Sequence, residues 1–410
     1  MPAPCRARAL LRKGRGLGQA RVCGTTREAT RERNVTMGEA QRRDGGASGR
    51  LVPAVSAARR LSRRSFVKLT AGAALLCAAP ALPGCSGGEA SSAGSAQGSG
   101  EGGGAETNSI TCFYFDTVIE IEAACSQDVL AEVESRLNYF ENKFSRTIEG
   151  SDISNINEAG GEPVEVCEET ADVIKKAIEY SEESDGLFDV TIGAVSSLWD
   201  FVEGVKPSDE EIAEAVKHVD YRTISVDGTT VTLADPKAKL DLGGIAKGYV
   251  TDDVVQMLLD AGCESACLSL GGNVYVMGPS FDGDEWNVGV QDPNGVYDDS
   301  VASLETRDMS VVTSGLYERY FEQDGVMYYH ILDPKTGYPV ETDLESVSIT
   351  SESSTAADAY ATILFLMGHD AAVDFVESDE RFPDGIFIDD DDQITTSEGS
   401  GFEVLQGDGQ

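Results

Sequence analysis

Two side chains that can bind a metal ion, Asp358 and Thr362, lie in a stretch that is otherwise apolar or alanine. This stretch, residues 355–367, is predicted to form a helix. Ser and Thr at 353–355 can cap its start, and Gly368 suits a left-handed position after its end. A helix that is apolar all round is usually buried. Spaced i, i+4, the two oxygen-bearing side chains share one face, one turn apart.

A carboxylate buried in such a helix needs a partner, because an unpaired buried charge is strongly destabilising. No Lys or Arg lies between Lys335 and Arg381, so no basic side chain close in the sequence can pair with Asp358. A hard divalent cation held by carboxylate and hydroxyl oxygens, with phosphates and water completing its shell, would meet the need. The alternative is an aspartate that accepts hydrogen bonds from backbone amides of a neighbouring turn.

A second candidate stretch, residues 241–249, places two glycines directly before a predicted helix. Gly243 and Gly244 allow a ligand to approach the backbone closely, and amides at a helix N-terminus attract phosphate. Lys247 lies in the first turn, where the helix dipole disfavours a cation, so a nearby anion would explain it. The alternative is a helix-capping turn with a surface lysine. The spacing of a Walker phosphate-binding loop is absent.

Three other features carry weaker signals. A flat ligand could lie across Leu187 and Phe188, although a helix end followed by core residues would look the same. The glycine pair at 271–272 predicts a tight turn or a bulge after a strand. Of the three histidines, only His330 lies in an informative context, and no Ser/His/Asp grouping predicts a hydrolase triad.

Periodicity predicts an α+β fold with mainly antiparallel sheets packed with helices. Helices are predicted at 127–143, 168–185, 208–219, within 240–261 and at 355–367, with a further short one ending at Ser378. Strands are predicted at 223–226, 230–233, 266–270, 273–277, 286–290, 310–314 and 328–332, and residues 113–124 are predicted to be a strand or one arm of a hairpin. The irregular alternation of strand and helix clusters argues against a doubly wound sheet. The acidic run at 389–392 is predicted to be a solvated turn between two strands.

The charge of the chain is unevenly distributed. Residues 1–85 carry 17 Lys and Arg against 4 Asp and Glu, whereas the remainder carries 15 against 67, for a net charge of −39. A chain whose residues after 85 are this acidic should repel nucleic acid and anionic lipid surfaces. We therefore predict no nucleic-acid partner. If its ligand is a phosphate ester, a metal ion or a local cluster of donors must offset this field.

The N-terminal region is predicted to be a leader followed by a flexible segment. Arg63 and Arg64, with the apolar run 69–82, resemble a twin-arginine export signal, and the run is too short to span a membrane. It ends near Cys85, which resembles the modified residue of a lipoprotein. Residues 1–85 are therefore assigned to the leader and signal, 86–109 to a Gly/Ser-rich tether and 110–410 to the folded domain. Export permits disulfides, but the domain's five cysteines leave at least one free or paired elsewhere.

Eight stretches, in order, resemble the ApbE family of FAD:protein FMN transferases. They are 115–117, 144–145 with 151–157, 185–191, 241–249, 270–272, 314–320, 330–339 and 357–362. The coverage runs from about residue 110 to residue 400. The resemblance implies an ApbE-like fold of helices on antiparallel sheets, related to the tunnelling fold. It also implies cleavage of the FAD pyrophosphate and transfer of FMN, as a phosphoester, to a threonine of a partner protein.

The resemblance further assigns roles to individual residues. Asp358 and Thr362, with a backbone oxygen near Gly244, are expected to bind Mg²⁺, and these two side chains and His330 are candidate catalytic residues. The residues expected to contact the flavin nucleotide are Phe115, Thr147, Leu187, Phe188, Asp189, Asp241, Lys247 and the backbone at Ile331. Family members often carry an aromatic residue around Thr147. Here only the guanidinium of Arg146 could replace its stacking contact.

The expected reaction is therefore Mg²⁺-dependent, with FAD as substrate and a redox protein of the membrane or cell surface as acceptor. The enzyme is expected to be exported, lipid-anchored and extracytoplasmic. Residues 227–230 begin like the acceptor pattern D-G-x-[ST]-x-[AS]-T but lack its last threonine, so the acceptor should be another protein. Two alternatives remain open: an FAD pyrophosphatase that releases FMN and AMP, and a non-catalytic flavin-binding lipoprotein.

Overall fold

The structure is a computed structural model. It describes residues 51–53, 107–295, 299–378, 382 and 384–405, all of which belong to the unit Ser48–Gln410. The predicted export signal, the lipid-attachment residue Cys85 and nearly all of the tether lie outside the described residues. Those predictions stay untested.

An eight-stranded sheet organises the described part of the chain. Its order is β16-β15-β14-β11-β8-β7-β3-β2, and every neighbouring pair is antiparallel. The strands are β2 (Asn108–Tyr114), β3 (Thr117–Ala123), β7 (Ala266–Leu270), β8 (Asn273–Met277), β11 (Met309–Gly315), β14 (Leu344–Ser351), β15 (Asp384–Asp389) and β16 (Ile394–Thr396). All five residues of β8 are buried, because both faces of the sheet are covered there.

Three smaller sheets surround this one. They are β1-β9-β10-β17, β4-β6-β5 and the hairpin β12-β13. Their strands are β1 (Leu51–Pro53), β4 (Val164–Glu165), β5 (Ile224–Asp227), β6 (Thr230–Leu233), β9 (Trp286–Gln291), β10 (Ser300–Thr306), β12 (Tyr320–Gln323), β13 (Val326–Tyr329) and β17 (Glu403–Val404). Val274 and Val311 of the large sheet share a buried cluster with Trp286 and Leu304, so β9 and β10 cover one of its faces.

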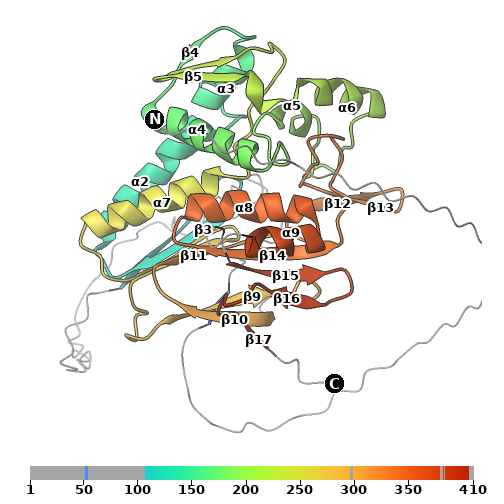
Figure 1. Cartoon of the computed structure of the whole chain (residues 1–410). Coiled ribbons are helices and arrows are strands. Elements are labelled where there is room, and N and C mark those ends of the chain that lie inside the picture. Colours follow the sequence, from blue (N-terminus) through green and yellow to red (C-terminus); the bar gives the residue numbers. More distant parts are fainter. Residues whose placement is uncertain (1–50, 54–106, 296–298, 379–381, 383, 406–410) are drawn as a thin grey trace, which may run out of the picture. The chain divides into compact units, whose positions relative to one another are not determined.

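Helices α2 (Gln127–Phe144), α7 (Ala246–Asp260), α8 (Ser354–Met367) and α9 (His369–Glu377) pack on strands of the large sheet from the opposite side. The other α-helices of the described residues are α3 (Asp152–Glu158), α4 (Glu168–Glu183), α5 (Gly193–Ser196) and α6 (Asp209–Ala215). Helix α8 packs on β11 and β14, and α7 lies beside it, as Figure 1 shows. The predicted α+β fold with antiparallel sheets is confirmed.

Most predicted elements are present, with corrections at their ends. The strand predicted at 328–332 is wrong beyond Tyr329, because the chain turns there and Leu332 forms only an isolated bridge with Pro339. The segment 113–124, predicted to be a strand or one arm of a hairpin, contains the end of β2 and all of β3, which form a hairpin whose turn is Phe115-Asp116. The expected tight turn at 271–272 and the acidic turn before β16 are both present. Strands β1, β4, β10, β12, β14 and β17 and helices α3 and α5 had not been predicted.

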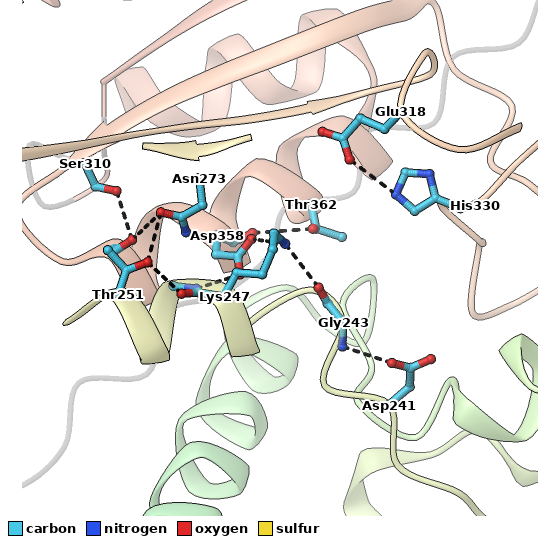
Figure 2. A network of polar contacts seen from close by, with 12 residues as sticks. Asp241, Gly243, Lys247, Thr251, Asn273, Ser310, Glu318, His330, Asp358 and Thr362 are labelled. Atoms are coloured by element: carbon cyan, nitrogen blue, oxygen red, sulfur yellow. Dashed lines mark hydrogen bonds and ion pairs between the residues drawn. The ribbon is translucent and has the colours of Figure 1, made fainter. Parts of the chain in front are cut away.

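The buried polar residue Asn273 ties helices α7 and α8 to the sheet (Figure 2). Its side-chain oxygen accepts a hydrogen bond from Ser354 Oγ at 2.8 Å, and Ser310 Oγ donates to Ser354 Oγ at 3.0 Å. Thr251 Oγ1 lies 3.5 Å from the same oxygen of Asn273. These contacts join α7, β8, β11 and α8, and so fix where the two helices rest on the sheet.

Helix α8 is capped by its neighbour as well as by its own sequence. Ser353 is the N-cap residue, as predicted, and accepts from the amide of Ala356. The carboxylate of Asp252, from α7, accepts hydrogen bonds from the amides of Ser354 at 2.7 Å and Thr355 at 3.0 Å. A carboxylate at a helix N-terminus satisfies free amides and interacts favourably with the dipole. Asp252 therefore fixes the start of α8 against α7.

Replacing Asp252 by alanine should lower the free energy of unfolding by about 2 kcal/mol, because the start of α8 loses its charged acceptor. The measurement is urea denaturation followed by circular dichroism. Asp260→Ala is the matched control, since Asp260 lies exposed at the end of α7 and bonds only Gln256 among the described contacts. It should change stability by less than about 0.5 kcal/mol. Equal effects of the two substitutions would contradict the assigned role of Asp252.

Candidate active site

The buried carboxylate of Asp358 has two partners, both in the first turn of α7. Its side chain is 5% exposed. One carboxylate oxygen lies 3.0 Å from Lys247 Nζ, and the other accepts from the amide of Gly248 at 2.9 Å. We had expected no basic partner close in the sequence, and the partner that exists comes from a residue 111 positions away. The bond from the Gly248 amide also agrees in part with the alternative prediction, in which backbone amides of a neighbouring turn hold Asp358.

Glycine at position 248 is what permits this contact. A Cβ atom there would lie 2.2 Å from the carbonyl oxygen of Ser354 and 2.8 Å from Cβ of Asp358. Neither backbone could yield without separating the helices. Helix α7 has no side-chain cap of its own, since its N-cap residue is Ile245. Asp358 therefore serves as an acceptor for the first turn of α7, while Lys247, disfavoured by the dipole, is held by the carboxylate.

The surroundings of Lys247 form an oxygen-lined cradle (Figure 2). Its ammonium also contacts the carbonyl oxygen of Gly243 at 3.4 Å. Thr362, one turn beyond Asp358 on α8, is half-buried, and its hydroxyl would lie 3.4 Å from a Cβ at Gly244. That same Cβ would come within 2.9 Å of the Phe188 ring. Only glycine therefore fits at position 244, between the aromatic ring and the hydroxyl.

This cradle fits a hard cation by the chemistry of its donors. A carboxylate, a hydroxyl and backbone carbonyl oxygens are ligands that Mg²⁺ accepts, and an ammonium ion already lies between the carboxylate and the carbonyl of Gly243. In the described residues no group of three or more His, Cys, Asp or Glu side chains could hold a metal ion. A site here would therefore depend on Thr362, the backbone and ligand oxygens in addition to Asp358.

Asp241 lies at the other end of the glycine turn and is held from three sides. Its carboxylate accepts from Ser196 Oγ at 2.6 Å and from the amide of Gly243 at 2.9 Å. Arg146 Nε lies 3.1 Å from the same carboxylate, with a third of the Arg146 side chain exposed. The guanidinium of Arg146, which precedes Thr147, therefore pairs with Asp241, one of the residues expected to contact the nucleotide. The exposed Thr147 hydroxyl itself contacts only Ser145 among the described contacts.

Two residues of the predicted turn at 187–189 have different surroundings. Phe188 contacts the glycine turn, whereas Asp189 is held by hydrogen bonds within the protein. Phe188 is buried and packs at Gly244. The Asp189 carboxylate is occupied by hydrogen bonds from Thr191 and from the amide of Tyr221. Burial raises the pKa of Asp189 and outweighs these hydrogen bonds. Leu187 is half-buried. The flavin contacts of these residues stay predictions.

A third group gathers around the ends of the β12–β13 hairpin. His330 Nε2 lies 3.8 Å from a carboxylate oxygen of Glu318, a residue that the sequence had not singled out. Next to His330, Ile331 is buried, and its carbonyl oxygen accepts from the amide of Val340. Figure 2 shows Glu318 and His330 near Thr362. Glu318 lies within the stretch 314–320 that resembles the family, but only its tertiary contact with His330 singles it out.

The turn between β2 and β3 is strained at a predicted ligand residue. Phe115 and Asp116 have φ of 54° and 57°, a left-handed conformation that is uncommon for residues with a Cβ and unfavourable for a bulky aromatic one. Arg319 Nη2 donates to the carbonyl oxygen of Asp116 at 3.1 Å, which links the turn to the hairpin that carries His330. Gly271, in the next turn of the sheet, has no room for a Cβ beside Thr117.

Comparison with known proteins agrees with this arrangement. The ApbE family model matches residues 115–384. The chain belongs to the ApbE family. A relative from Treponema pallidum, named FAD:protein FMN transferase, is 37% identical over 291 residues, which is 66% of this chain and 79% of that protein. A relative of the same name from Vibrio cholerae is 32% identical over 264 residues, which is 63% of this chain and 78% of that protein.

Solved structures show the same fold. The crystal structure of the ApbE protein of Thermotoga maritima superposes with a TM-score of 0.66 at 37% identity, over 72% of this chain and 97% of that one. The structure of the flavin transferase ApbE of Vibrio cholerae superposes with a TM-score of 0.64 at 28% identity, over 72% of this chain and 98% of that one. The ApbE-like fold implied by the sequence is confirmed.

Replacing Lys247 by methionine should lower the free energy of unfolding by about 2–4 kcal/mol, because Asp358 is left buried without its cation. Adding Asp358→Asn to this variant should restore part of the loss. The measurement is urea denaturation at pH 7 without divalent ions. Lys217→Met is the control, since Lys217 is 66% exposed in its pair with Glu214 and should matter by less than about 0.5 kcal/mol. A Lys247→Met variant no less stable than this control would refute the buried pairing.

Proposed function

We propose that the protein is a Mg²⁺-dependent FAD:protein FMN transferase, which cleaves the pyrophosphate of FAD and attaches FMN to a threonine of a separate acceptor protein. The membership in the ApbE family and the shared name of the curated relatives support the reaction. The observation that carries the proposal to a site is the buried Lys247–Asp358 pair beside an open glycine turn. The Lys247 ammonium of this pair places a positive charge where an anionic substrate could approach the backbone.

The proposed roles follow from the chemistry of these groups. Asp358, Thr362 and a backbone oxygen of the Gly243-Gly244 turn would hold Mg²⁺, which supplies neutralisation of phosphate charge when bound. Lys247 would bind the pyrophosphate oxygens beside the N-terminus of α7, where the helix dipole favours an anion. Phosphoryl transfer needs mainly positioning and charge neutralisation. The net charge of −39 makes such local positive groups necessary, because the body as a whole repels anions.

The test combines the purified chain with FAD, Mg²⁺ and an acceptor protein that carries the D-G-x-[ST]-x-[AS]-T pattern. We expect the acceptor to gain the mass of one FMN while an equal amount of AMP appears. Asp358→Asn should slow transfer by about 10²–10³-fold, since it removes a charged ligand of the proposed metal site. A chelator should stop the reaction, and added Mg²⁺ should restore it.

Asp370→Asn is the matched control, because the Asp370 carboxylate is fully exposed just beyond α8 and should not affect the rate. Release of FMN and AMP without labelling of the acceptor would instead favour the FAD pyrophosphatase. FAD that stays intact with metal and acceptor present would exclude both enzymatic functions and leave a flavin-binding protein.

We further propose that the protein is exported through its twin-arginine signal and anchored by lipid at Cys85, with a membrane or cell-surface redox protein as acceptor. The arginine pair, the short apolar run and the cysteine that follows it support this proposal. In the part of the chain that the structure describes, no helix is long and apolar enough to cross a membrane.

Cell fractionation tests the anchor. The wild-type protein should be found with the membranes, and Cys85→Ala should be released from them, because the cysteine sulfur is the proposed point of lipid attachment. Ser86→Ala, next in the sequence, is the control and should keep the protein on the membranes. Membrane association that persists in Cys85→Ala would contradict the lipid anchor at this residue.

A further inference from the structure

Two cysteines that are far apart in the sequence, Cys125 and Cys263, meet beside the end of helix α7. Cys125 follows strand β3, and Cys263 lies between α7 and β7. Strands β3 and β7 are antiparallel neighbours in the large sheet. Beyond the last pair of this ladder, the amide of Ala124 donates to the carbonyl oxygen of Ser265 at 2.8 Å. The backbone alone therefore brings the segments that carry the two cysteines together.

The two thiols are also in contact with each other. The side chain of Cys125 is hydrogen-bonded to that of Cys263. Cys263 belongs to the buried cluster under α2, α7 and α8, here called the helix-side cluster, and the half-buried Cys125 packs against the same cluster. The amide of Cys263 donates to the carbonyl oxygen of Leu258 at 3.0 Å. Asn108 Nδ2 donates to the carbonyl oxygen of Cys125 at 2.8 Å. Both backbones are thus held where the sulfur atoms are neighbours.

Two other cysteines of the large sheet lie away from this pair. Cys267 of β7 packs against the buried cluster shared with β9 and β10, on the face opposite to the helix-side cluster. Cys112 of β2 packs on the helix side, but it lies about 13 Å along the strand from Asn108, the residue that contacts Cys125. Cys112 and Cys267 therefore lie on different faces of the sheet, and neither can replace a member of the pair.

Cys167, the fifth cysteine of the described residues, has its own surroundings. Its sulfur lies 3.1 Å from Thr170 Oγ1 at the start of α4. Its side chain is also hydrogen-bonded to Tyr139, which lies about 20 Å along α2 from Cys125. Among the described cysteines, the fold therefore selects one pairing.

We propose that Cys125 and Cys263 form a disulfide when the folded chain meets a disulfide oxidant. The bond joins the end of α7 to the start of α2 and closes the long loop 126–262. A crosslink across so long a loop restricts the unfolded chain and so stabilises the folded one. The site lies outside the proposed active site and does not depend on FMN transfer.

The oxidant is a small disulfide, for which oxidised glutathione is the probe. One cysteine, as its thiolate, attacks a sulfur of oxidised glutathione and releases one glutathione thiol. The second cysteine then displaces the remaining glutathione from the mixed disulfide. One S–S bond forms in the protein and one breaks in the oxidant, which takes up both electrons and both protons.

The exchange is slow in the folded chain at neutral pH. Burial and the hydrogen bond to Cys263 raise the pKa of the Cys125 thiol to about 12, and the thiolate is the reactive form. The full-length chain is therefore incubated with oxidised glutathione at about pH 8.5 until its composition no longer changes.

Peptide mapping tests the pairing directly. The remaining thiols are alkylated, and the chain is digested without a reductant and analysed by mass spectrometry. We expect one crosslinked peptide pair that contains Cys125 and Cys263. The thiols that should be recovered alkylated are Cys112, Cys167 and Cys267. The proposal is overturned if the crosslink is absent, or if either member of the pair is linked to another cysteine.

Thermal melting measures what the bond contributes to stability. The oxidised wild-type chain should melt about 4–8 °C above the reduced chain, because the crosslink lowers the entropy of the unfolded state. Cys125→Ala and Cys263→Ala should each abolish this difference. Cys267→Ala is the matched control and should keep it, because Cys267 is close to Cys263 in the sequence but packs on the other face of the sheet.

Comparing the oxidised and reduced forms of one variant removes the effect of the substitution itself. Should Cys263→Ala fail to fold because this side chain is buried, Cys125→Ala decides, since Cys125 is only half-buried. A melting difference that persists in Cys125→Ala would refute the assigned pair. A crosslinked wild type that melts no higher than the reduced chain would refute its stabilising role.

Discussion

The contact between the first turn of α7 and the middle of α8 determines the rest of this site. Gly248 allows the two backbones to meet, and Asp358 then accepts from the Gly248 amide and from the Lys247 ammonium. Asp252 of α7 has the reciprocal role, because its carboxylate caps the start of α8. Each helix thus provides a carboxylate for the N-terminal region of the other. A shift of either helix would break both sets of hydrogen bonds together.

This arrangement also explains how so acidic a protein can present a site for an anion. Asp358 is paired within the protein with Lys247, beside the glycine turn that precedes α7. Arg146 faces the same turn through Asp241, and Arg319 lies at the hairpin opposite. The positive groups are thus few and local. In the proposed function these groups attract the phosphate-bearing ligand locally, whereas the net negative charge of the chain repels other polyanions.

Much of the fold could be predicted from the sequence because its elements have regular patterns. Helix α8 was recognised from its apolar run, its Ser/Thr start and Gly368, and strands β7 and β8 agree with the predicted limits residue for residue. Strand β14 was missed although Val347 and Ile349 alternate with Ser346, Ser348 and Thr350. Its Ser and Thr residues are typical of loops, and their burial on the second face of the strand comes from tertiary packing, which local sequence does not show.

The site itself was predictable in its residues but not in its contacts. Asp358 and Lys247 were identified from their unusual surroundings in the sequence, and Asp241 from the resemblance to the ApbE family. The ion pair between Lys247 and Asp358, however, joins residues far apart in the chain. Local spacing could not reveal it, and the search for a basic partner near Asp358 therefore found none. Glu318 was overlooked for the same reason, because its meaning depends on His330 across the β12–β13 hairpin.

The most direct test of the central claim is a crystal structure of the protein with FAD and Mn²⁺ in place of Mg²⁺, recorded with the anomalous signal of manganese. We predict one manganese peak within about 2.2 Å of an Asp358 carboxylate oxygen, with Thr362 and the Gly243-Gly244 turn beside it and the FAD pyrophosphate at the start of α7. A peak at another group of residues, or FAD bound away from this turn while Lys247 still holds Asp358, would contradict the account.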